Sequence, residues 1–561
     1  MTAPPSSTPR VADRPLSTLP IRFRGSRGAR GPVTLGQHNV LRWLGSDGDR
    51  SDVLPVFIEL RAGHTLAEVI GALGVLVARH EALRTRFELD GPDGPVQSVQ
   101  VDGEIELQLH EVVGERLPFI GELVWRQIAV PFDVVDGLPL RVLAVTEHAA
   151  PIVIVLLFCH AAVDAAGAAI VGEQLRALLD GRDDLAEERG HQPLDQAEWE
   201  QSEVGRRRTR SALKYWDTRL RQVPQAMCAL PPHPRGVPGQ VERRMVSTAV
   251  ASALRTLAGR TGASHSTVVL AATAALLGVY TATPAGTMVS ICGNRFRSAW
   301  REYVGPLAQD ALVPFTLDDD ALFDDLVRQV QATTINAYRY AQFDSVQLWE
   351  VISAVGHDRG SHFHRDAVFN DLGAAGTRAA EDAPEDAVAA LADTRLEPMP
   401  DRILPTAFLL TLGGVGEAEA DLRLHADTAR FPDVDGILLA VERLLVTAAT
   451  GDVRLRDVAT LTGFAPVERD ERWQVIDSSW VDTGAVRALL DQVLNELPEP
   501  ARARVDIQDG RIVAHVAADC TPERLHAAML ARLPRHPAVL APHHYVVHDT
   551  DGSIRAEGSG R

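Results

Sequence analysis

The sequence predicts an α/β protein of several domains, and three observations support this fold class. The chain has 561 residues, which at roughly 100 to 200 residues per domain corresponds to three or four folding units. Short apolar runs typical of strands alternate with longer segments whose apolar residues recur at helical spacing. Between residues 456 and 475 the pattern changes, and the elements that follow have an order of their own.

The first part of the chain predicts helices and strands in turn. Residues 65–87 repeat apolar side chains at helical spacing from Leu66 to Leu73. A helix over 122–133 should stop before Pro131, because the residue before a proline avoids helical geometry. The predicted helices are 33–44, 65–87, 122–133 and 168–181, and the predicted strands are 54–60, 105–112, 138–147 and 151–158, the last two joined by the turn "HAAP".

The middle of the chain contains two segments without periodicity. Residues 182–206 are polar and acidic, which predicts a linker, and residues 373–402 are alanine- and acid-rich, which predicts a long surface loop. Around them the predicted helices are 211–222, 266–281 and 434–449, and the predicted strands are 286–295, 404–412 and 420–427.

The last segment predicts a separate small α/β domain over 470–555. A hairpin over 503–517 turns at Asp509-Gly510, a pair that favours tight hairpin turns. A helix begins after the capping residue Thr521, with proline in its first turn. A helix over 481–497 and a strand over 543–549 complete the set.

Composition and charge exclude several classes of protein. Hydrophobic residues make up 45% and charged residues 23%, which is ordinary for a globular protein. Lysine and arginine number 56 against 75 acidic residues, and a net charge of −19 argues against a nucleic-acid partner or an anionic membrane. The four cysteines are far apart, as expected of reduced thiols in a cytoplasm.

The amino-terminal residues predict a disordered tail over 1–24. They are rich in proline, serine and threonine and lack the apolar core of a signal peptide. No window of the chain approaches the ~18 consecutive apolar residues that a membrane span needs. We therefore expect neither a signal peptide nor a membrane-spanning segment.

Several segments resemble known functional motifs but lack the residue spacing that those motifs require. "GSRGARG" (25–31) lacks the phosphate-binding pattern, so we expect a flexible lead-in. "HRDAVFN" (364–370) has three residues between its aspartate and asparagine where a kinase catalytic loop has four. His357, His362 and His364 have no acidic or cysteine partner at a regular offset, so we expect a solvated loop and no metal.

One group of polar residues, at the end of a predicted strand, has a spacing that is compatible with catalysis. The apolar run 151–158 ends at Cys159 and His160, and Asp164 follows four residues after the histidine. A histidine at the rim of a sheet can face a pocket and act as a base. Asp164 can equally cap the next helix, and His160 can be an ordinary loop residue. The residues alone leave both interpretations open.

Six segments, taken in chain order, resemble the condensation domains of nonribosomal peptide synthetases. The stretch "RHEALRTRF" (79–87) matches a signature of that family nearly letter for letter. The resemblance covers roughly residues 30–455. Its other segments are "VPFDVVDGLPLRV" (130–142), "CHAAVDA" (159–165) in the place of the family's HHxxxDG motif, "KYWDTRL" (214–220), "CGNR" (292–295) and "DAVFNDLG" (366–373).

The resemblance implies two chloramphenicol acetyltransferase-like lobes set in a V around a central tunnel. The N-terminal lobe would cover 25–205 and the C-terminal lobe 206–458. A donor acyl thioester on the phosphopantetheine arm of an acyl- or peptidyl-carrier protein would enter from one side. A small-molecule or carrier-bound amine or alcohol acceptor would enter from the other. The resemblance implies no bound cofactor.

The same resemblance assigns roles to three residues. His160 matches the family's second histidine, and we expect it to accept the acceptor's proton, a role that suits a neutral imidazole. Asp164 is expected to be structural, paired with Arg295 in "CGNR". Backbone amides at the start of the following helix are candidates to stabilise an oxyanion.

The chain departs from the family pattern at three places. Cys159 replaces the first histidine of the motif and is expected to support the loop; a nucleophilic role is not favoured, since no base is arranged beside it. Ala165 replaces the motif glycine, and its methyl would narrow the tunnel. Gln309 in "YVGPLAQDALVPF" (303–315) is nearest to a family asparagine. Ala165, Gly167 and Gln309 are expected to line the tunnel.

The last segment resembles the small C-terminal subdomain of adenylation enzymes, on the stretch 509–534. In "DGSIRAEG" (551–558), Ser553 stands where those enzymes have a catalytic lysine, and the chain has no large adenylation core. Adenylate formation is therefore not expected. A docking or scaffolding role is expected instead, with a generic α/β appendage as the alternative.

We therefore expect a free-standing, cytoplasmic acyltransferase of nonribosomal-peptide or antibiotic biosynthesis that forms an amide or ester bond. One alternative is an acyltransferase of the same fold that uses acyl-coenzyme A. Another is a catalytically silent, condensation-like module that recruits a partner, which the departures at Cys159 and Ala165 support. An epimerase is less favoured, because the sequence shows no additional base.

Overall fold

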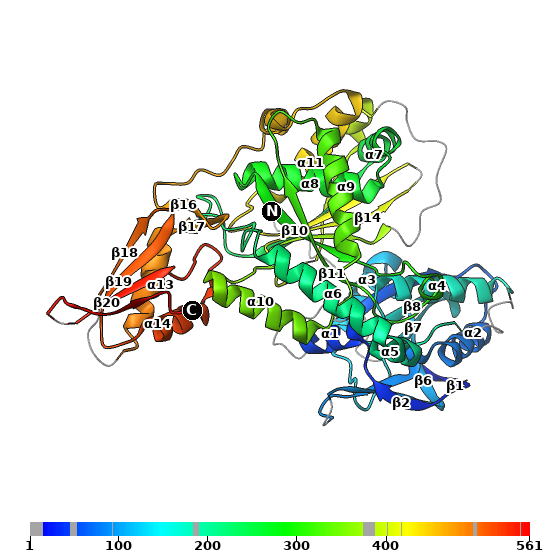
Figure 1. Cartoon of the computed structure of the whole chain (residues 1–561). Helices are drawn as coiled ribbons and strands as arrows, with labels where there is room; N and C mark the ends of the chain where they lie inside the picture. The colour runs from blue at the N-terminus through cyan, green and yellow to red at the C-terminus, as the bar shows by residue number, and fades with distance from the viewer. Residues whose placement is uncertain are drawn as a thin grey trace, which may run out of the picture. The chain divides into compact units, whose positions relative to one another are not determined.

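The chain forms two compact units, each with helices packed on β-sheets (Figure 1). The computed structural model describes residues 15–44, 53–91, 94–182, 190–373, 387–400, 402–416, 418–497, 502–549 and 551–561. Unit 1 consists of residues 1–208 and 293–309, and unit 2 of residues 209–292 and 310–561. The predicted α/β fold class is confirmed.

Unit 1 contains a five-stranded sheet in the order β1-β6-β7-β8-β3. Strands β6 and β7 are parallel, and the other neighbours are antiparallel. The strands are β1 (Ser17–Arg24), β3 (Val53–Glu59), β6 (Asp102–Glu111), β7 (Leu140–Glu147) and β8 (Ala150–Cys159). The predicted turn between β7 and β8 is confirmed: His148 and Ala149 have φ of 53° and 63°, the left-handed geometry of a two-residue hairpin turn.

Helices cover both faces of this sheet. Helices α2 (Leu66–Arg79) and α4 (Ala165–Leu179) contribute to the apolar cluster on one face, and α3 (Arg116–Ile128) packs on the other. Thr65 and Glu68 form a reciprocal capping box at the start of α2. The remaining elements of unit 1 are α1 (Leu35–Leu44), a 3-10 turn (Glu81–Arg84), α5 (Pro193–Gln201), a 3-10 turn (Ser298–Trp300), and a small sheet of β2 (Ala29–Pro32), β5 (Val96–Val99) and β4 (Thr85–Glu88).

Unit 2 is built on a seven-stranded sheet in the order β11-β10-β12-β14-β15-β9-β13. Its strands are β9 (Gln240–Ser247), β10 (Ala285–Cys292), β11 (Gln309–Thr316), β12 (Ala367–Asp371), β13 (Arg395–Pro398), β14 (Phe408–Val415) and β15 (Ala420–Asp427). Both faces are covered, so the central strands are apolar on both sides, as parallel and mixed sheets of this type require.

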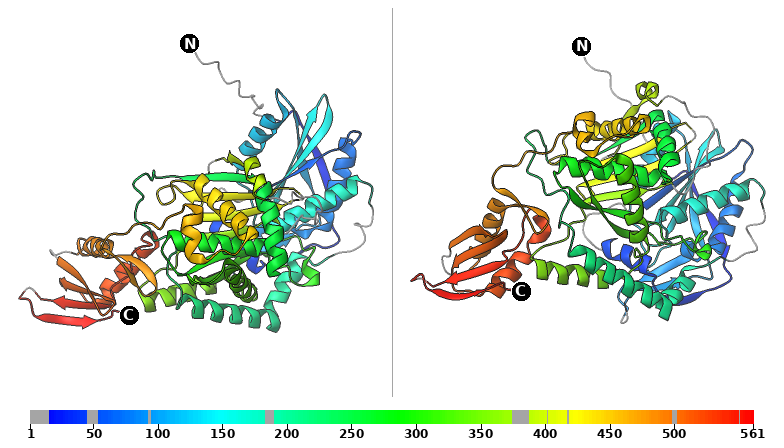
Figure 2. Two further views of the ribbon diagram at one scale, coloured as in Figure 1. Left: turned by 90° about the horizontal axis from the view of Figure 1, so that it is seen from above. Right: turned by 45° about the horizontal axis from the view of Figure 1, so that its top comes forward.

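The helices of unit 2 divide between the two faces of that sheet. Helices α7 (Thr248–Thr261), α8 (His265–Tyr280), α9 (Phe323–Tyr338) and α11 (Val434–Thr450) form the larger core with one face of the sheet (Figure 2). Helices α6 (Glu203–Leu220) and α10 (Ser345–Arg359) pack on the other. Short elements are 3-10 turns at Ala389–Asp393 and Leu455–Asp457 and the helix α12 (Val458–Thr462).

The carboxy-terminal part of unit 2 has its own core and a sheet in the order β18-β19-β20-β21 (Figure 1). Asp509 and Gly510, with φ of 49° and 70°, make the predicted hairpin turn. Thr521 caps the helix that follows, with Pro522 in its first turn. The elements are β16 (Trp473–Ile476), β17 (Ser479–Asp482), α13 (Thr483–Leu494), β18 (Arg502–Gln508), β19 (Arg511–Ala517), α14 (Pro522–Leu530), a 3-10 turn (Leu533–Arg535), β20 (His544–His548) and β21 (Ile554–Gly558).

The predicted disordered tail is wrong for residues 17–24. These residues form β1, which pairs with β6 over its whole length and buries Ile21 and Phe23. The hydrogen-bonding partner is distant in sequence, as the pairing of Ser17 with Leu109 shows, so local composition could not indicate it. The part of the prediction that concerns residues 1–14 lies outside the described residues.

The lead-in at 25–31 is ordered rather than flexible. It contains β2, and the Arg27 guanidinium donates to both carboxylate oxygens of Glu81, at 2.7 and 2.8 Å, and to Asp195 at 2.7 Å. Ion pairs to distant residues therefore fix a stretch whose glycines suggested mobility.

Three predicted boundaries also change. The helix predicted to reach residue 87 ends at Arg79, because His80 is extended and a 3-10 turn and β4 follow. The predicted linker contains α5 and the start of α6. The predicted loop contains β13, which pairs with β9, while its residues 374–386 lie outside the described part of the chain.

Within the described ranges, no single helix is both long and apolar enough to cross a membrane. Only α7 and α8 meet that test when counted together, and they are bent by 100° at the break between them.

Candidate active site

The histidine of interest lies where a buried central strand ends. Strand β8 is buried from Val153 to its last residue, Cys159. The backbone then turns sharply, since the N–H groups of Ala162 and Val163 both donate to the Cys159 carbonyl, at 3.0 and 3.2 Å. His160 is thereby placed in the turn before α4, and it is half-buried rather than sealed in the core.

An aromatic side chain from α1 contacts this histidine. The rings of Trp43 and His160 have centroids 5.6 Å apart and planes inclined by 77°, an edge-on arrangement. Trp43 is the penultimate residue of α1 and is half-buried.

Asp164 joins three parts of unit 1. It is the N-cap of α4 and accepts a hydrogen bond from the Gly167 N–H at 2.9 Å. Its two oxygens also accept from the Arg295 guanidinium, at 2.6 and 2.8 Å. The backbone N–H groups of Leu307 and Ala308 add two further bonds, at 2.9 and 3.2 Å. The carboxylate is thus both a helix cap and half of an ion pair.

The charge state of Asp164 follows from these bonds. Burial of the carboxylate by itself would raise its pKa, but the nearby Arg295 charge and the donated hydrogen bonds outweigh burial and hold the pKa below its ordinary value. Asp164 therefore stays ionised, as a partner for a guanidinium must.

Arg295 fastens the segment 293–309 within unit 1. Besides Asp164, its guanidinium donates to the carbonyls of Gly293, Tyr303 and Gly305, at 3.1 to 3.2 Å. This planar group with several donors satisfies a carboxylate and three carbonyls together. The segment lies in the sequence range expected for the second lobe, yet its contacts assign it to unit 1.

Two glycines allow the backbone segments around the Asp164–Arg295 ion pair to approach each other closely. A Cβ on Gly167 would lie 3.3 Å from the Gly305 nitrogen and 3.1 Å from the Val163 side chain. A Cβ on Gly36, in α1, would lie 2.0 Å from the carbonyl oxygen of Pro306. Helix α1 therefore packs directly on the segment that holds Asp164.

The other predicted site residues have simpler surroundings. Cys159 is fully buried among the apolar side chains of unit 1. Ala165 is the first residue of α4 and is half-buried, whereas Gly167 and Gln309 are buried. The Gly167 N–H is donated to Asp164 and so is not available to an oxyanion. The role of Ala165, Gly167 and Gln309 as a tunnel lining stays a prediction.

The signature segment 79–87 is structural in its contacts. Glu81 is 1% exposed and binds Arg27, and its backbone N–H donates to Gln192 at 2.9 Å. His80 lies 2.6 Å from the side-chain oxygen of Gln174 in α4, and burial lowers its pKa to about 4. Since that oxygen is an acceptor, the His80 ring donates to it and ties the motif to the helix after His160.

The discarded motifs lie elsewhere and have structural partners. Asp366 accepts bonds from the N–H groups of Met227 and Cys228, at 3.1 and 2.8 Å, and burial raises its pKa to about 6. His362 and His364 contact each other, with ring centroids 5.0 Å apart. Among the residues that the structure describes, no three histidine, cysteine or acidic side chains lie together as a metal site would need.

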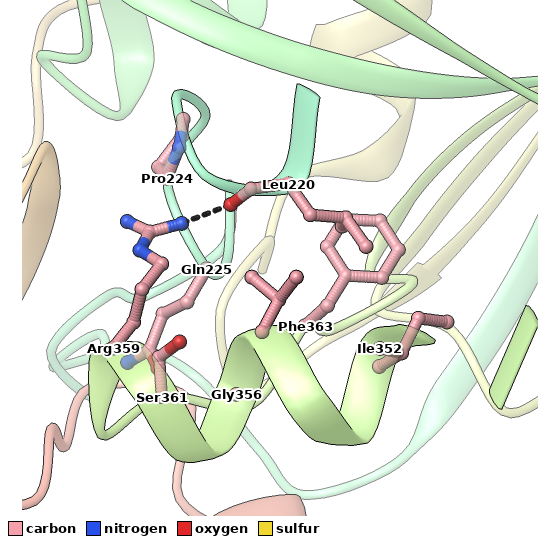
Figure 3. Close-up of a pocket in the computed structure, with 9 residues that line it drawn as sticks. Leu220, Pro224, Gln225, Ile352, Gly356, Arg359, Ser361 and Phe363 are labelled. Atoms are coloured by element: carbon pink, nitrogen blue, oxygen red, sulfur yellow. Dashed lines mark hydrogen bonds between the residues drawn. The ribbon is translucent and has the colours of Figure 1, made fainter. Parts of the chain in front are cut away.

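In the described part of the chain, a small cavity and an open groove lie away from the candidate residues. One, of about 10 Å³, lies between α6 and α10, and Figure 3 shows Arg359 beside it donating to the Leu220 carbonyl. That volume suits one water molecule at most. The other is an open groove of about 670 Å³ between β1 and α2.

Known proteins give a consistent picture. A family model described as "Condensation domain" matches residues 46–431. Phosphinothricin tripeptide synthetase PhsC of Streptomyces viridochromogenes is 28% identical over 352 residues, which cover 60% of this chain and 31% of PhsC. The chain thus spans less than a third of that relative.

Solved structures share the fold. The SgcC5 protein from Streptomyces globisporus matches with a TM-score of 0.57 and 20% identity, over 75% of this chain and 99% of SgcC5. The condensation domain of the Monacolin K polyketide synthase MokA matches with a TM-score of 0.61 and 16% identity, over 76% and 99% of the two chains. At these identities the likeness concerns the fold.

Proposed function

Because the chain belongs to the condensation-domain family, we propose that it joins a carrier-protein-bound acyl or aminoacyl thioester to an amine or alcohol acceptor. The family forms amide bonds, and its members in nonribosomal peptide synthesis act on substrates bound to carrier proteins. The proposed product is an amide or an ester in natural-product biosynthesis. No tightly bound cofactor is needed, since the donor carries its own phosphopantetheine thioester.

In the proposed reaction, the lone pair of the acceptor nitrogen or oxygen attacks the thioester carbonyl carbon. His160 accepts the proton that the acceptor loses. The tetrahedral intermediate then collapses, the C–S bond breaks, and the thiolate takes the proton from the imidazolium. The base is restored, and the products are the amide or ester and the free thiol of the carrier.

The observation that carries this proposal is the geometry around His160. The ring is half-buried at the end of β8, and the turn that holds it is fixed four residues later by the buried bonds of Asp164. A fixed base is what in-line attack requires, because holding the reactants in place removes much of the barrier. Cys159, the residue before His160, is buried in the core.

Assays of the proposed reaction should test alcohols as well as amines as acceptors. SgcC5, of the same fold, was crystallised with (R)-(−)-1-(2-naphthyl)-1,2-ethanediol, which is an alcohol. Acceptor panels should therefore contain both classes.

The test is product formation from a loaded carrier protein, followed by mass spectrometry. His160→Ala should lower the rate by about 100-fold or more, as for the loss of a general base. His148→Asn is the matched control: this histidine is exposed in the β7–β8 turn, and asparagine tolerates its φ of 53°. An unchanged rate in His160→Ala would exclude the proposed proton transfer.

The same assay distinguishes the two alternatives. Product from acyl-coenzyme A but not from a loaded carrier would favour the coenzyme-A-dependent enzyme. No product with any donor, together with tight binding of a carrier or enzyme, would favour the silent recruitment module. That the enzyme acts free-standing stays a prediction, which separately purified carrier proteins test.

A further inference from the structure

We propose that Trp43 is a positioning residue, which holds the imidazole of His160 in its reactive orientation through the edge-on contact between their rings. The inference deepens the proposed function, because it concerns the same histidine. Trp43 precedes His160 by more than a hundred residues and belongs to none of the matching segments, so only the structure places it beside the histidine.

The contact is built on a helix that is anchored at its other end. Thr34 and Gln37 exchange hydrogen bonds at the start of α1, at 2.8 and 3.1 Å. The Leu35 N–H donates to Glu200 of α5 at 2.8 Å. Helix α1 therefore begins at a fixed point.

The same end of α1 contacts the segment whose backbone binds Asp164. Gly36 lies against Pro306, directly before Leu307 and Ala308, whose N–H groups bind Asp164. Gly36 and Trp43 both lie on α1, seven residues apart, so about 10 Å of helix separates them. Helix α1 thus positions both Trp43 and the segment that supports the turn of His160.

The contact with Trp43 restricts the rotation of the His160 imidazole. The backbone of residues 159–163 is fixed by hydrogen bonds, but the imidazole still rotates about its side-chain bonds unless neighbouring atoms restrict it. An aromatic neighbour at 5.6 Å, inclined by 77°, favours one ring orientation over the others. An aliphatic side chain fills similar space without that directional preference.

The contact is tested directly by nuclear magnetic resonance on the full chain. The eight tryptophans give separate indole N–H signals, and the one missing in Trp43→Phe belongs to Trp43. That signal should shift in His160→Gln, while the signal of Trp125, 47% exposed on α3 and assigned in the same way, should not. A Trp43 signal that does not move in His160→Gln would overturn the proposal. This measurement needs neither substrate nor activity.

Kinetics test the orienting role. Trp43→Leu should lower kcat by about tenfold with KM nearly unchanged, and Trp43→Phe should retain most of the activity, because phenylalanine restores an aromatic contact. Equal kcat in the wild type and Trp43→Leu, or equal losses in the leucine and phenylalanine variants, would overturn the orienting role. If the wild type forms no product, the proposed function fails while the resonance experiment still decides the contact.

Discussion

Replacing Asp164 by asparagine should destabilise unit 1 far more than the same replacement at an exposed ion pair. The side chains of Asp164 and Arg295 are 2% and 13% exposed, and the carboxylate accepts five hydrogen bonds. Asparagine removes the charge and turns one acceptor oxygen into an NH₂ group that faces other donors. Breaking one partner of a buried pair typically costs about 3–5 kcal/mol.

Asp180 provides the matched control within the same unit. It pairs with Arg61 at 2.7 Å, but the two side chains are 41% and 79% exposed. An exposed pair contributes about 1 kcal/mol or less. In a unit of roughly 200 residues, 1 kcal/mol shifts the midpoint by about 2–4 °C, so Asp164→Asn should lower it by about 6–20 °C and Asp180→Asn by no more than about 4 °C.

Differential scanning calorimetry of the full chain measures both shifts. Equal midpoints in the two variants would refute the argument that burial makes the Asp164 pair costly to break. The pH adds a second check. Because the folded pKa of Asp164 is below its ordinary value, its contribution is present above about pH 4 and is lost as the pH falls through the folded pKa. The difference between wild type and Asp164→Asn should therefore shrink in acid.

Two further predictions concern packing and acid sensitivity. Gly36→Ala should destabilise the protein, because the new Cβ would lie 2.0 Å from the Pro306 oxygen, whereas Gly71→Ala, with nothing within 4 Å, should stabilise helix α2 by about 0.5–1 kcal/mol. Thermal midpoints of the two variants that move in the same direction would contradict this. Burial lowers the pKa of His80 to about 4, so as the pH falls this residue is protonated in the unfolded chain before it is protonated in the native state. The native state should therefore lose about 3 kcal/mol of stability between pH 6.5 and 4. His80→Gln should flatten that dependence in urea unfolding; an unchanged slope would count against it.

Elements with local signals were predictable from the sequence. The turn at His148 and Ala149 lies between two apolar runs, and the Asp509-Gly510 pair by itself favours a hairpin. Thr521 followed by proline is typical of a helix start. In each case the residues that determine the structure are neighbours in sequence.

Elements held by distant partners were not predictable in this way. Strand β1 exists because β6 pairs with it, and only the weak alternation of Ile21 and Phe23 hinted at a strand. The lead-in is held by Arg27, whose partners Glu81 and Asp195 lie 54 and 168 residues away. Such contacts appear only once the chain has folded.

The residues of the candidate site also fall into two groups, those with a local sequence signal and those that only distant contacts bring to the site. His160 and Asp164 were singled out because they follow one apolar strand, and the choice between a cap and an ion pair stayed open. The structure shows that Asp164 serves as both. The contributions of Leu307, Ala308 and Trp43 could not be found from the sequence, since two are backbone amides and the third lies on a helix far from the motif.

The place of residues 293–309 has a consequence for how the protein is synthesised. The guanidinium that neutralises Asp164 follows it by 131 residues, so a ribosome adding 5–20 residues per second needs roughly 7–26 s to supply it. During that interval the nascent amino-terminal part holds a carboxylate that cannot be buried without its counter-charge. Unit 1 thus completes its interior only after the first segment of unit 2, residues 209–292, has been translated, and a fragment that stops at residue 208 should keep this region unfinished.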